Sequence, residues 1–278
     1  MPTRKYVLDE NYFEQIDTEE KAYILGFLYA DGCNSVSVSG GCTVSLQLAK
    51  QDEEILIKIS KIIYYNNVYL REYKRDVTRQ NMVILSLNSK KISNDLIKWG
   101  CVPNKTFVLK FPSLSDNLKS HFIRGYFDGD GSLTFTQAKN RNQITALFAI
   151  VSTIEMLDSI GQKCKDLDIH YRISKRHKDR DNNNYTLTIS GNIQIKKFCE
   201  FLYKDANIYL QRKYKNFVKL KELKLREPVS DEEILKALND NPKIVSITKL
   251  SSIIKMDRHV LSRRLKELES KWINTQLI

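Results

Sequence analysis

The sequence lacks paired cysteines and long apolar runs. Its five cysteines are odd in number and widely spaced, without a Cys-x-x-Cys pair. This pattern argues against a disulfide framework and a structural zinc site, so we predict reduced thiols. The longest apolar runs are a few residues, which excludes a membrane-spanning helix. The opening MPTRKYVLDE lacks the apolar core of a signal peptide, so we expect an intracellular protein of the cytoplasm, nucleoid or an organelle matrix.

Acidic residues are outnumbered by basic ones. The 278 residues include 45 Lys or Arg and 33 Asp or Glu, which gives a net charge of +12. This excess favours a polyanionic partner such as nucleic acid, although a solvated basic surface has the same composition. A hydrophobic content of 42% is sufficient for one large domain or for two smaller ones with their own cores.

One motif occurs twice, and the same pattern of elements follows each copy. YILGFLYADGC (23–33) and FIRGYFDGDGS (122–132) share Gly, Asp and Gly at matching offsets. After each motif, apolar and polar residues alternate as in a β-hairpin, and apolar residues then recur at helical spacing. The same hairpin and helix patterns follow once more. We therefore predict an α+β protein, a pseudo-two-fold pair of αββαββα units over residues 1–110 and 111–227.

Residues 228–278 show no strand alternation and are predicted to form a small all-α domain. Ser230 and Asp257 are suitable N-caps for its first and last helices. The spacing of the last two helices suits a helix-turn-helix that binds DNA, although a small bundle packed on the main body is the alternative. The base-reaching end of the recognition helix would carry Arg258, His259, Ser262 and Arg263.

Each predicted motif helix has a glycine in its body, Gly26 in the first and Gly125 in the second. An interior glycine costs about 1 kcal/mol of helix stability relative to alanine. A repeated cost at one position indicates a shared purpose, because two helix backbones can approach closely where there is no side chain. We predict that the two helices pack together, with Gly26 near Gly125.

Both motif helices end at a carboxylate, Asp31 or Asp130, where the helix dipole disfavours negative charge. Two converging carboxylates would also repel each other, unless a divalent cation bridges them. Oxygen ligands suit Mg²⁺, which also binds phosphate oxygens, so a basic protein with this pair could hydrolyse phosphodiesters. The alternative is that each aspartate only shapes a helix-to-strand turn with the glycine that follows it.

ILGFLYADG (24–32) and IRGYFDGDG (123–131) resemble the two motifs of the LAGLIDADG homing endonucleases in their single-chain form. The resemblance covers roughly residues 15–225 and implies saddle-shaped antiparallel sheets that lie in the major groove. It implies that Asp31 and Asp130 are catalytic and bind Mg²⁺, which Mn²⁺ can replace. The metal site would also include Ala30 and Gly129. Tyr29 stands where the second motif has Asp128, at a position that is not the metal ligand.

The resemblance also assigns a basic residue to each active site, and Lys105 and Lys213 lie in similar settings at the ends of the two units. We predict that both are catalytic and stabilise charge on the phosphate or help to activate water, with ordinary phosphate contact as the alternative. Lys50 and Ser152 end the second strand of each unit and are candidates for organising solvent.

Alternation along the predicted hairpins separates apolar positions, which would face the helices, from polar and basic positions, which would face DNA. A polar strand face is often exposed to solvent without binding a partner. Four such faces beside two metal-binding carboxylates favour contact with DNA. The predicted DNA-facing residues are Ser35, Ser37, Thr43, Ser45, Gln47, Lys50, Tyr69, Arg71, Tyr73, Arg75, Ser132, Thr134, Thr136, Arg172, Ser174, Arg176, Lys178 and Arg180.

The sequence therefore predicts a monomeric, site-specific endonuclease of intron homing, which makes a staggered double-strand break at a long, nearly asymmetric DNA target. A non-catalytic transcription regulator with the same body and a helix-turn-helix tail is one alternative, and an intron RNA maturase is another. Retention of both acids favours the nuclease. An intein is not expected, because splicing residues are missing at Met1-Pro2 and at the closing NTQLI.

Overall fold

The structure is a computed structural model. It describes residues 7–37, 40–73, 81–137, 144–177, 182–223, 229–241, 246–254, 256 and 258–276. The chain divides into two compact units, Met1–Leu223 and Lys224–Ile278.

The first repeat of the larger unit begins with the motif helix α1 (Glu19–Asp31), which Thr18 caps by accepting a hydrogen bond from the Lys21 amide. Its strands form one antiparallel sheet in the order β1-β2-β4-β3. The elements after α1 are β1 (Gly32–Val36), β2 (Cys42–Ala49), α2 (Glu53–Ile63), β3 (Leu70–Tyr73), β4 (Met82–Leu87) and α3 (Lys90–Lys98). Each element lies where the sequence predicted it.

The second repeat has the same order of elements and the same sheet topology, β5-β6-β8-β7. Its elements are α4 (Asp116–Asp130), β5 (Gly131–Gln137), β6 (Ile144–Ser152), α5 (Ile154–Asp166), β7 (Tyr171–Lys175), β8 (Tyr185–Ser190) and α6 (Asn192–Tyr203). Two four-stranded antiparallel sheets in repeated αββαββ units confirm the predicted fold class. One further helix, α7 (Gln211–Glu222), was not predicted, because its sequence is strongly basic and only Phe217 and Leu220 mark a buried apolar face.

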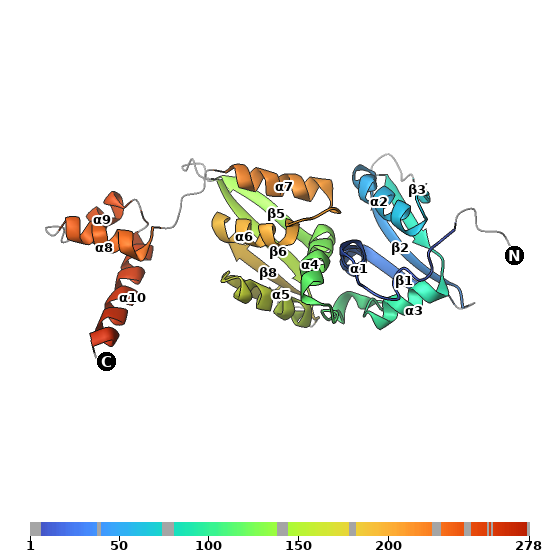
Figure 1. Cartoon of the computed structure of the whole chain (residues 1–278), viewed down its shortest axis with the longest axis horizontal. Helices are drawn as coiled ribbons and strands as arrows, with labels where there is room; N and C mark the ends of the chain where they lie inside the picture. Colours follow the sequence, from blue (N-terminus) through green and yellow to red (C-terminus); the bar gives the residue numbers. More distant parts are fainter. Residues whose placement is uncertain are drawn as a thin grey trace. The chain divides into compact units, whose positions relative to one another are not determined.

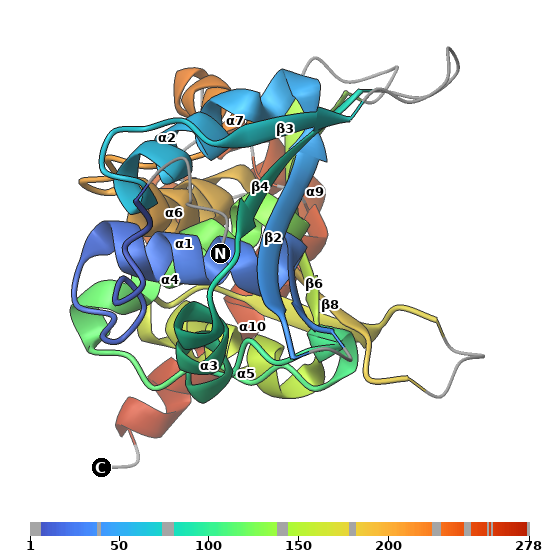
Figure 2. The same ribbon diagram turned by 90° about the vertical axis from the view of Figure 1, so that its right-hand side faces the viewer.

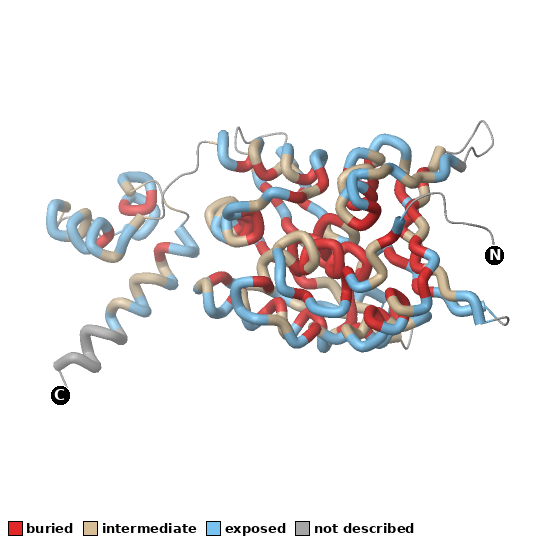
Figure 3. The backbone as a smooth tube through the Cα atoms, turned by 45° about the vertical axis from the view of Figure 1, so that its right-hand side comes forward, coloured by how far each residue is buried: buried red, intermediate tan, exposed pale blue. Residues whose placement is uncertain are grey.

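The motif helices α1 and α4 lie side by side between the two sheets (Figure 1). Neither glycine has room for a side chain. An added Cβ at Gly26 would overlap the carbonyl oxygen of Phe122, and one at Gly125 would overlap that of Tyr23. The predicted close packing is therefore confirmed, and Figure 3 shows the buried residues concentrated along these two helices.

Helices cover one face of each sheet, and the other face is open. In the view of Figure 2 the strands form one side of the larger unit, while helices α1 to α6 lie toward the other. The strand alternation agrees with this arrangement: in β5, Leu133 is buried, whereas Ser132 and Thr134 on either side of it are exposed.

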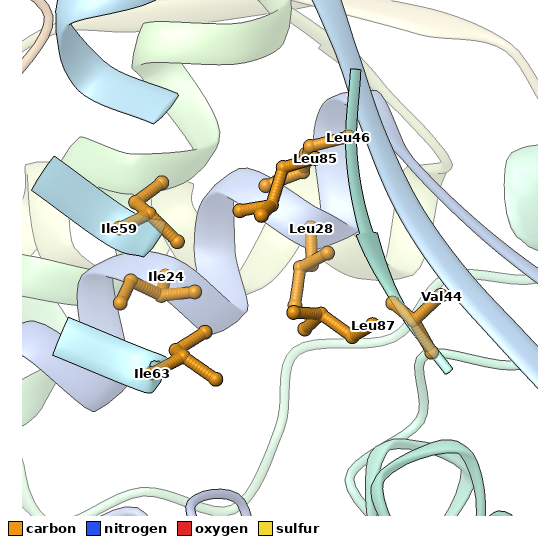
Figure 4. A pocket seen from close by; sticks show the side chains of 8 residues that line it. All are labelled: Ile24, Leu28, Val44, Leu46, Ile59, Ile63, Leu85 and Leu87. Atoms are coloured by element: carbon orange, nitrogen blue, oxygen red, sulfur yellow. The ribbon is translucent and has the colours of Figure 1, made fainter. Parts of the chain in front are cut away.

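The first half has an aliphatic core between its motif helix and its sheet. A small pocket there is lined by side chains from α1, α2, β2 and β4, and all of them are aliphatic (Figure 4). These residues are Ile24, Leu28, Val44, Leu46, Ile59, Ile63, Leu85 and Leu87. A pocket without polar groups is a gap in core packing and offers a ligand nothing that would orient it.

The smaller unit consists of α8 (Asp231–Asp240), α9 (Ile247–Ile253) and α10 (Arg258–Gln276), as predicted. Ser230 caps α8 in a capping box with Glu233, whereas Asp257 lies outside the described residues. Buried Ile234, Leu250 and Leu261 give this unit its own hydrophobic core.

The five cysteines are free thiols, in agreement with the prediction. Among the helices that the structure describes, none has both the length and the apolar character needed to cross a membrane.

Candidate catalytic centre and nucleic-acid interface

The two motif aspartates stand at the touching C-terminal ends of α1 and α4. At this contact Gly129 abuts Ala30, and an added Cβ at Gly129 would lie 3.1 Å from the Oδ2 atom of Asp31. Glycine is therefore needed just before Asp130 to let the two helix ends meet. Both carboxylates remain accessible to solvent although protein atoms crowd them.

Burial makes both carboxylates hard to ionise, and repulsion adds to this effect at Asp31. Burial by the surrounding protein, followed by the charge of Asp130, raises the pKa of Asp31 to about 6. Burial also raises the pKa of Asp130, and Lys105 and Lys213 partly offset that effect. A pair of carboxylates that repel each other in an accessible position suits a bound cation.

The described residues contain no group of three or more His, Cys, Asp or Glu side chains placed to bind a metal. A cation held by Asp31 and Asp130 would take its other ligands from backbone, water or phosphate oxygens. Mg²⁺ binds in this manner, through one or two carboxylates together with waters and substrate phosphates. The residues present therefore fit Mg²⁺.

Each half contributes a buried lysine that returns to the end of its own motif helix. The Lys105 Nζ donates to the carbonyl oxygen of Gly32, just after α1. The Lys213 Nζ donates to the carbonyl oxygens of Phe127, Gly131 and Gly129, at 2.5, 2.6 and 3.3 Å. The C-terminal carbonyls of a helix carry partial negative charge, so a cation is stabilising there. Both lysines occupy the parallel settings that the sequence predicted.

Each aspartate feels the charge of both lysines, and the lysine of the opposite half has the larger effect on it. Lys105 is the largest influence that lowers the pKa of Asp130, and Lys213 is the largest that lowers the pKa of Asp31. Burial lowers the pKa of Lys213 itself to about 8. The two centres are therefore composite, and each contains groups from both repeats.

A cavity beside Asp130 is lined from both halves, with Lys105, Ser152 and Arg176 in its wall. Ser152 lies at the end of β6, as predicted, and accepts a hydrogen bond from the Tyr126 hydroxyl at 2.8 Å. Arg176 was predicted as a groove-facing residue, but it lies close enough to Asp130 to lower the pKa of that carboxyl. Its sequence spacing gave no sign of this position.

Asn184 also lines this cavity, and sequence reasoning missed it. Its Oδ1 atom is buried and has no hydrogen-bond partner within the described part of the chain. The first-half counterpart of Ser152 is Lys50, just after β2, which pairs with Glu53 and whose Nζ lies 3.9 Å from Glu72. The two halves therefore carry different side chains at this strand end.

Most of the predicted groove-facing residues lie on the open faces of the sheets. The register pairs Ser35 with Thr43 and Thr134 with Leu147, which places paired residues on the same face. The residues placed on these faces are Ser35, Thr43, Ser45, Gln47, Arg71, Ser132, Thr134, Thr136, Arg172 and Ser174.

Some of the predicted residues lie elsewhere or are not described. Tyr69 is partly buried and packs against Tyr64 at the edge of the core. The Ser37 hydroxyl accepts a hydrogen bond from the Gly41 amide within the β1–β2 turn. Tyr73 ends β3, but its side chain is outside the described set, as are the whole of Arg75, Lys178 and Arg180.

Strand β6 breaks the expected alternation on its open face. Leu147 is 43% exposed there, beside Thr134 of β5 and Ser190 of β8. Ala149 and Val151 continue this apolar line along the strand toward the cavity beside Asp130. These positions were not predicted, because every residue of 146–151 is apolar and no alternation separates the two faces.

In the smaller unit, Arg258, His259 and Arg263 are exposed in the first part of α10, as a recognition helix requires. Arg263 lies 3.7 Å from Glu267, one turn further along the helix, and Ser262 is half-buried. Three of the four residues predicted at this end are thus accessible to a partner.

Residues 117–202 match the family model of the LAGLIDADG-like domain. At 26% identity over 197 residues, the chain is also similar to a probable translation initiation factor IF-2 of Methanocaldococcus jannaschii. That alignment takes in 67% of this chain and only 15% of the length of the curated relative.

Two solved structures share the fold at low sequence identity. The LAGLIDADG homing endonuclease I-GzeII in complex with its DNA target has a TM-score of 0.52 and 10% identity, over 84% of this chain and 96% of that one. A lysine-to-alanine mutant of I-SmaMI has a TM-score of 0.51 and 12% identity, over 71% of this chain and 89% of that one. The chain therefore has the LAGLIDADG homing endonuclease fold, and residues 117–202 of its second repeat match the LAGLIDADG-like domain.

Proposed function

We propose that this protein is a site-specific DNA endonuclease that makes a metal-dependent, staggered double-strand break at a long, nearly asymmetric target. The observation that carries the proposal is the pair of accessible carboxylates, Asp31 and Asp130, at the touching ends of α1 and α4. A purely structural role would not favour two repelling carboxylates at helix C-termini, where negative charge is disfavoured.

In this proposal Asp31 and Asp130 would hold Mg²⁺, which Mn²⁺ could replace, and the metal site would include Ala30 and Gly129. When bound, the cation supplies Lewis-acid stabilisation of the phosphate and lowers the pKa of a bound water. Lys105 and Lys213 approach the same point from opposite halves and stabilise negative charge that develops on the phosphate. The protein contributes preorganisation, because both lysines are buried and fixed on backbone carbonyls.

The open faces of the two sheets would read the duplex in its major groove. Arg71, Arg172 and Gln47 are exposed and suit base edges or phosphates. Leu147 is an exposed apolar side chain between Thr134 and Ser190, and the thymine methyl is the apolar group that the major groove presents. Different side chains at equivalent positions of the two halves would produce an asymmetric target.

The proposal is tested by incubating the protein with a library of randomised duplexes in Mg²⁺ buffer and sequencing the cut ends. We expect enrichment of a single long target with a fixed stagger, and loss of all cutting when EDTA replaces Mg²⁺. Specific binding to a target without any cutting would contradict the proposal and favour a transcription regulator. The three-helix unit with its own core is the observation that supports this second candidate.

We also propose that residues 228–278 add DNA affinity rather than chemistry. Truncation after residue 227 is expected to weaken target binding about tenfold or more, because it removes a basic helix that makes phosphate or base contacts. The single-turnover cleavage rate at saturating protein should stay within about twofold of wild type. Binding is measured by fluorescence anisotropy at two salt concentrations. Unchanged affinity and salt dependence would show that the tail takes no part in DNA binding.

A further inference from the structure

One position in each motif helix connects that helix to the segment that carries the lysine. In the first motif this residue is Tyr29, which is 1% exposed and donates a hydrogen bond from its hydroxyl to the carbonyl oxygen of Trp99. The chain runs directly over this hydroxyl, because an added Cβ at Gly100 would overlap it. Gly100 has a φ of +91°, which favours glycine for a second reason.

In the second motif the matching residue is Asp128, and it makes the corresponding connection with different chemistry. Its buried carboxylate accepts hydrogen bonds from the Leu210 amide at 2.6 Å, from the Tyr23 hydroxyl at 2.8 Å and from the Tyr203 hydroxyl at 3.2 Å. Leu210 is the N-cap residue of α7, so Asp128 fixes the start of that helix. Tyr23 belongs to α1, and this bond also links the two motif helices.

Each connection leads to the lysine of the same half. Lys105 follows Trp99 by six residues (105 − 99), and Lys213 follows Leu210 by three (213 − 210). Each lysine then returns to the end of the motif helix from which the connection started. In both repeats the contacts thus form a closed loop, which runs from the motif helix through a buried side chain to the lysine segment and back. The phenol of Tyr29 makes the connection in the first repeat, and the carboxylate of Asp128 makes it in the second.

We propose that Tyr29 and Asp128 are positioning residues, each of which holds the lysine of its own half in place and thereby controls the cleavage of one DNA strand. This inference rests on the proposed endonuclease function. Geometry is the reason for a large effect: a displacement of about 1 Å in a catalytic group can lower a rate by about 10²-fold. Neither residue needs to touch DNA to have this effect.

The effect should be strand-specific because the hydrogen bond to each lysine segment lies within a single repeat. The Tyr29 hydroxyl donates to the Trp99 carbonyl within the first repeat, and the Asp128 carboxylate accepts from the Leu210 amide within the second. A double-strand break requires two phosphodiesters to be cut, one on each strand, and in this proposal each lysine serves one of the two cuts. Loosening one loop should therefore slow one strand and leave the other unaffected.

The experiment uses the full chain and its selected target, with a different fluorophore on the 5′ end of each strand. Under single-turnover conditions, Tyr29→Phe is expected to slow the cutting of one strand by about tenfold or more and to leave the other within about twofold. Asp128→Asn should slow the opposite strand, so the two variants accumulate nicked products of opposite polarity. Tyr203→Phe removes a weaker bond to Asp128 and serves as the second variant if Asp128→Asn does not fold.

Tyr64→Phe is the matched control. Tyr64 is also buried in the first repeat and donates from its hydroxyl to a backbone carbonyl, that of Ser86 at 2.8 Å, but it lies on neither loop. This variant should cut both strands at wild-type rates even if its melting temperature falls. Equal slowing of both strands by Tyr29→Phe and Asp128→Asn, or no slowing, would overturn the positioning role. A wild-type protein that cuts no DNA would instead overturn the proposed function, and the inference with it.

Discussion

Asp31→Asn and Asp130→Asn are each expected to lower double-strand cleavage by at least about 10²–10³-fold, the loss seen when one preorganised stabilising group is removed. Asparagine preserves the shape of the side chain but lacks the charge that holds a divalent cation. Affinity for the target, measured in Ca²⁺-free and Mg²⁺-free buffer, should stay the same or increase, because the change removes negative charge that faces phosphates. Asp158→Asn, an exposed aspartate of α5, is the matched control and should cut normally.

The same variants separate metal binding from folding. Mg²⁺ binds the folded state alone and should raise the melting temperature of the wild type, whereas Asp31→Asn and Asp130→Asn should lose most of this increase. Normal cutting by both variants, or an unchanged Mg²⁺ response, would show that these carboxylates are not the metal ligands.

In metal-free buffer the free energy of unfolding should fall as the pH rises, because folding favours the protonated form of two carboxyl groups. The pKa of Asp31 is raised from 3.8 to about 6, so its protonated form is favoured by folding. The stability that protonated Asp31 contributes to the folded state is fully present below about pH 4 and is lost as the pH rises through about 6. Asp128, whose burial also raises its pKa to about 6, contributes in the same direction. Asp31→Asn should therefore remove part of the pH dependence and leave the part that Asp128 supplies.

The repeat made most of this fold predictable, because the αββαββ unit occurs twice in the sequence and both copies predict the same order of elements. Paired glycines predicted the helix contact, and the paired aspartates and lysines predicted which side chains meet there. What the sequence could not show depends on contacts between segments far apart in the chain. Tyr29 and Asp128 differ in chemistry, and only the positions of Trp99 and Leu210 reveal that they make equivalent connections.

Alternation was informative only where the two faces of a strand differ in polarity. It placed Thr134 of β5 correctly, but it could not assign Leu147, which lies in the apolar run of β6. The position of Arg176 beside Asp130 depends on the bend of a hairpin whose sequence alone shows a simple basic alternation. The places of Arg176 and Asn184 in the cavity wall were therefore the part of the site that sequence reasoning missed, whereas Ser152 was predicted there.

The largest expected effect on stability comes from filling the contact between the motif helices. Gly26→Ala and Gly125→Ala should each destabilise the protein by about 1–3 kcal/mol, the usual cost of overpacking a core. This loss would occur although alanine is intrinsically better than glycine in a helix by about 1 kcal/mol. The added methyl meets backbone rather than a flexible side chain: at Gly26 it overlaps Phe122 and lies 2.9 Å from the Tyr126 nitrogen. Relief requires the two helices to move apart.

Urea denaturation of the two variants and their combination measures this effect. The double variant is expected to lose more than either single variant, and its separated helix ends should also weaken the Mg²⁺-dependent rise in melting temperature. Gly41→Ala is the control, because an added Cβ there meets only the Ser37 hydroxyl, at 3.1 Å. If Gly26→Ala and Gly125→Ala are as stable as wild type, the helices have room between them, and the close contact that brings Asp31 to Asp130 does not exist. The bridging of the two carboxylates by one cation would then fail for a structural reason, whatever the cleavage assays show.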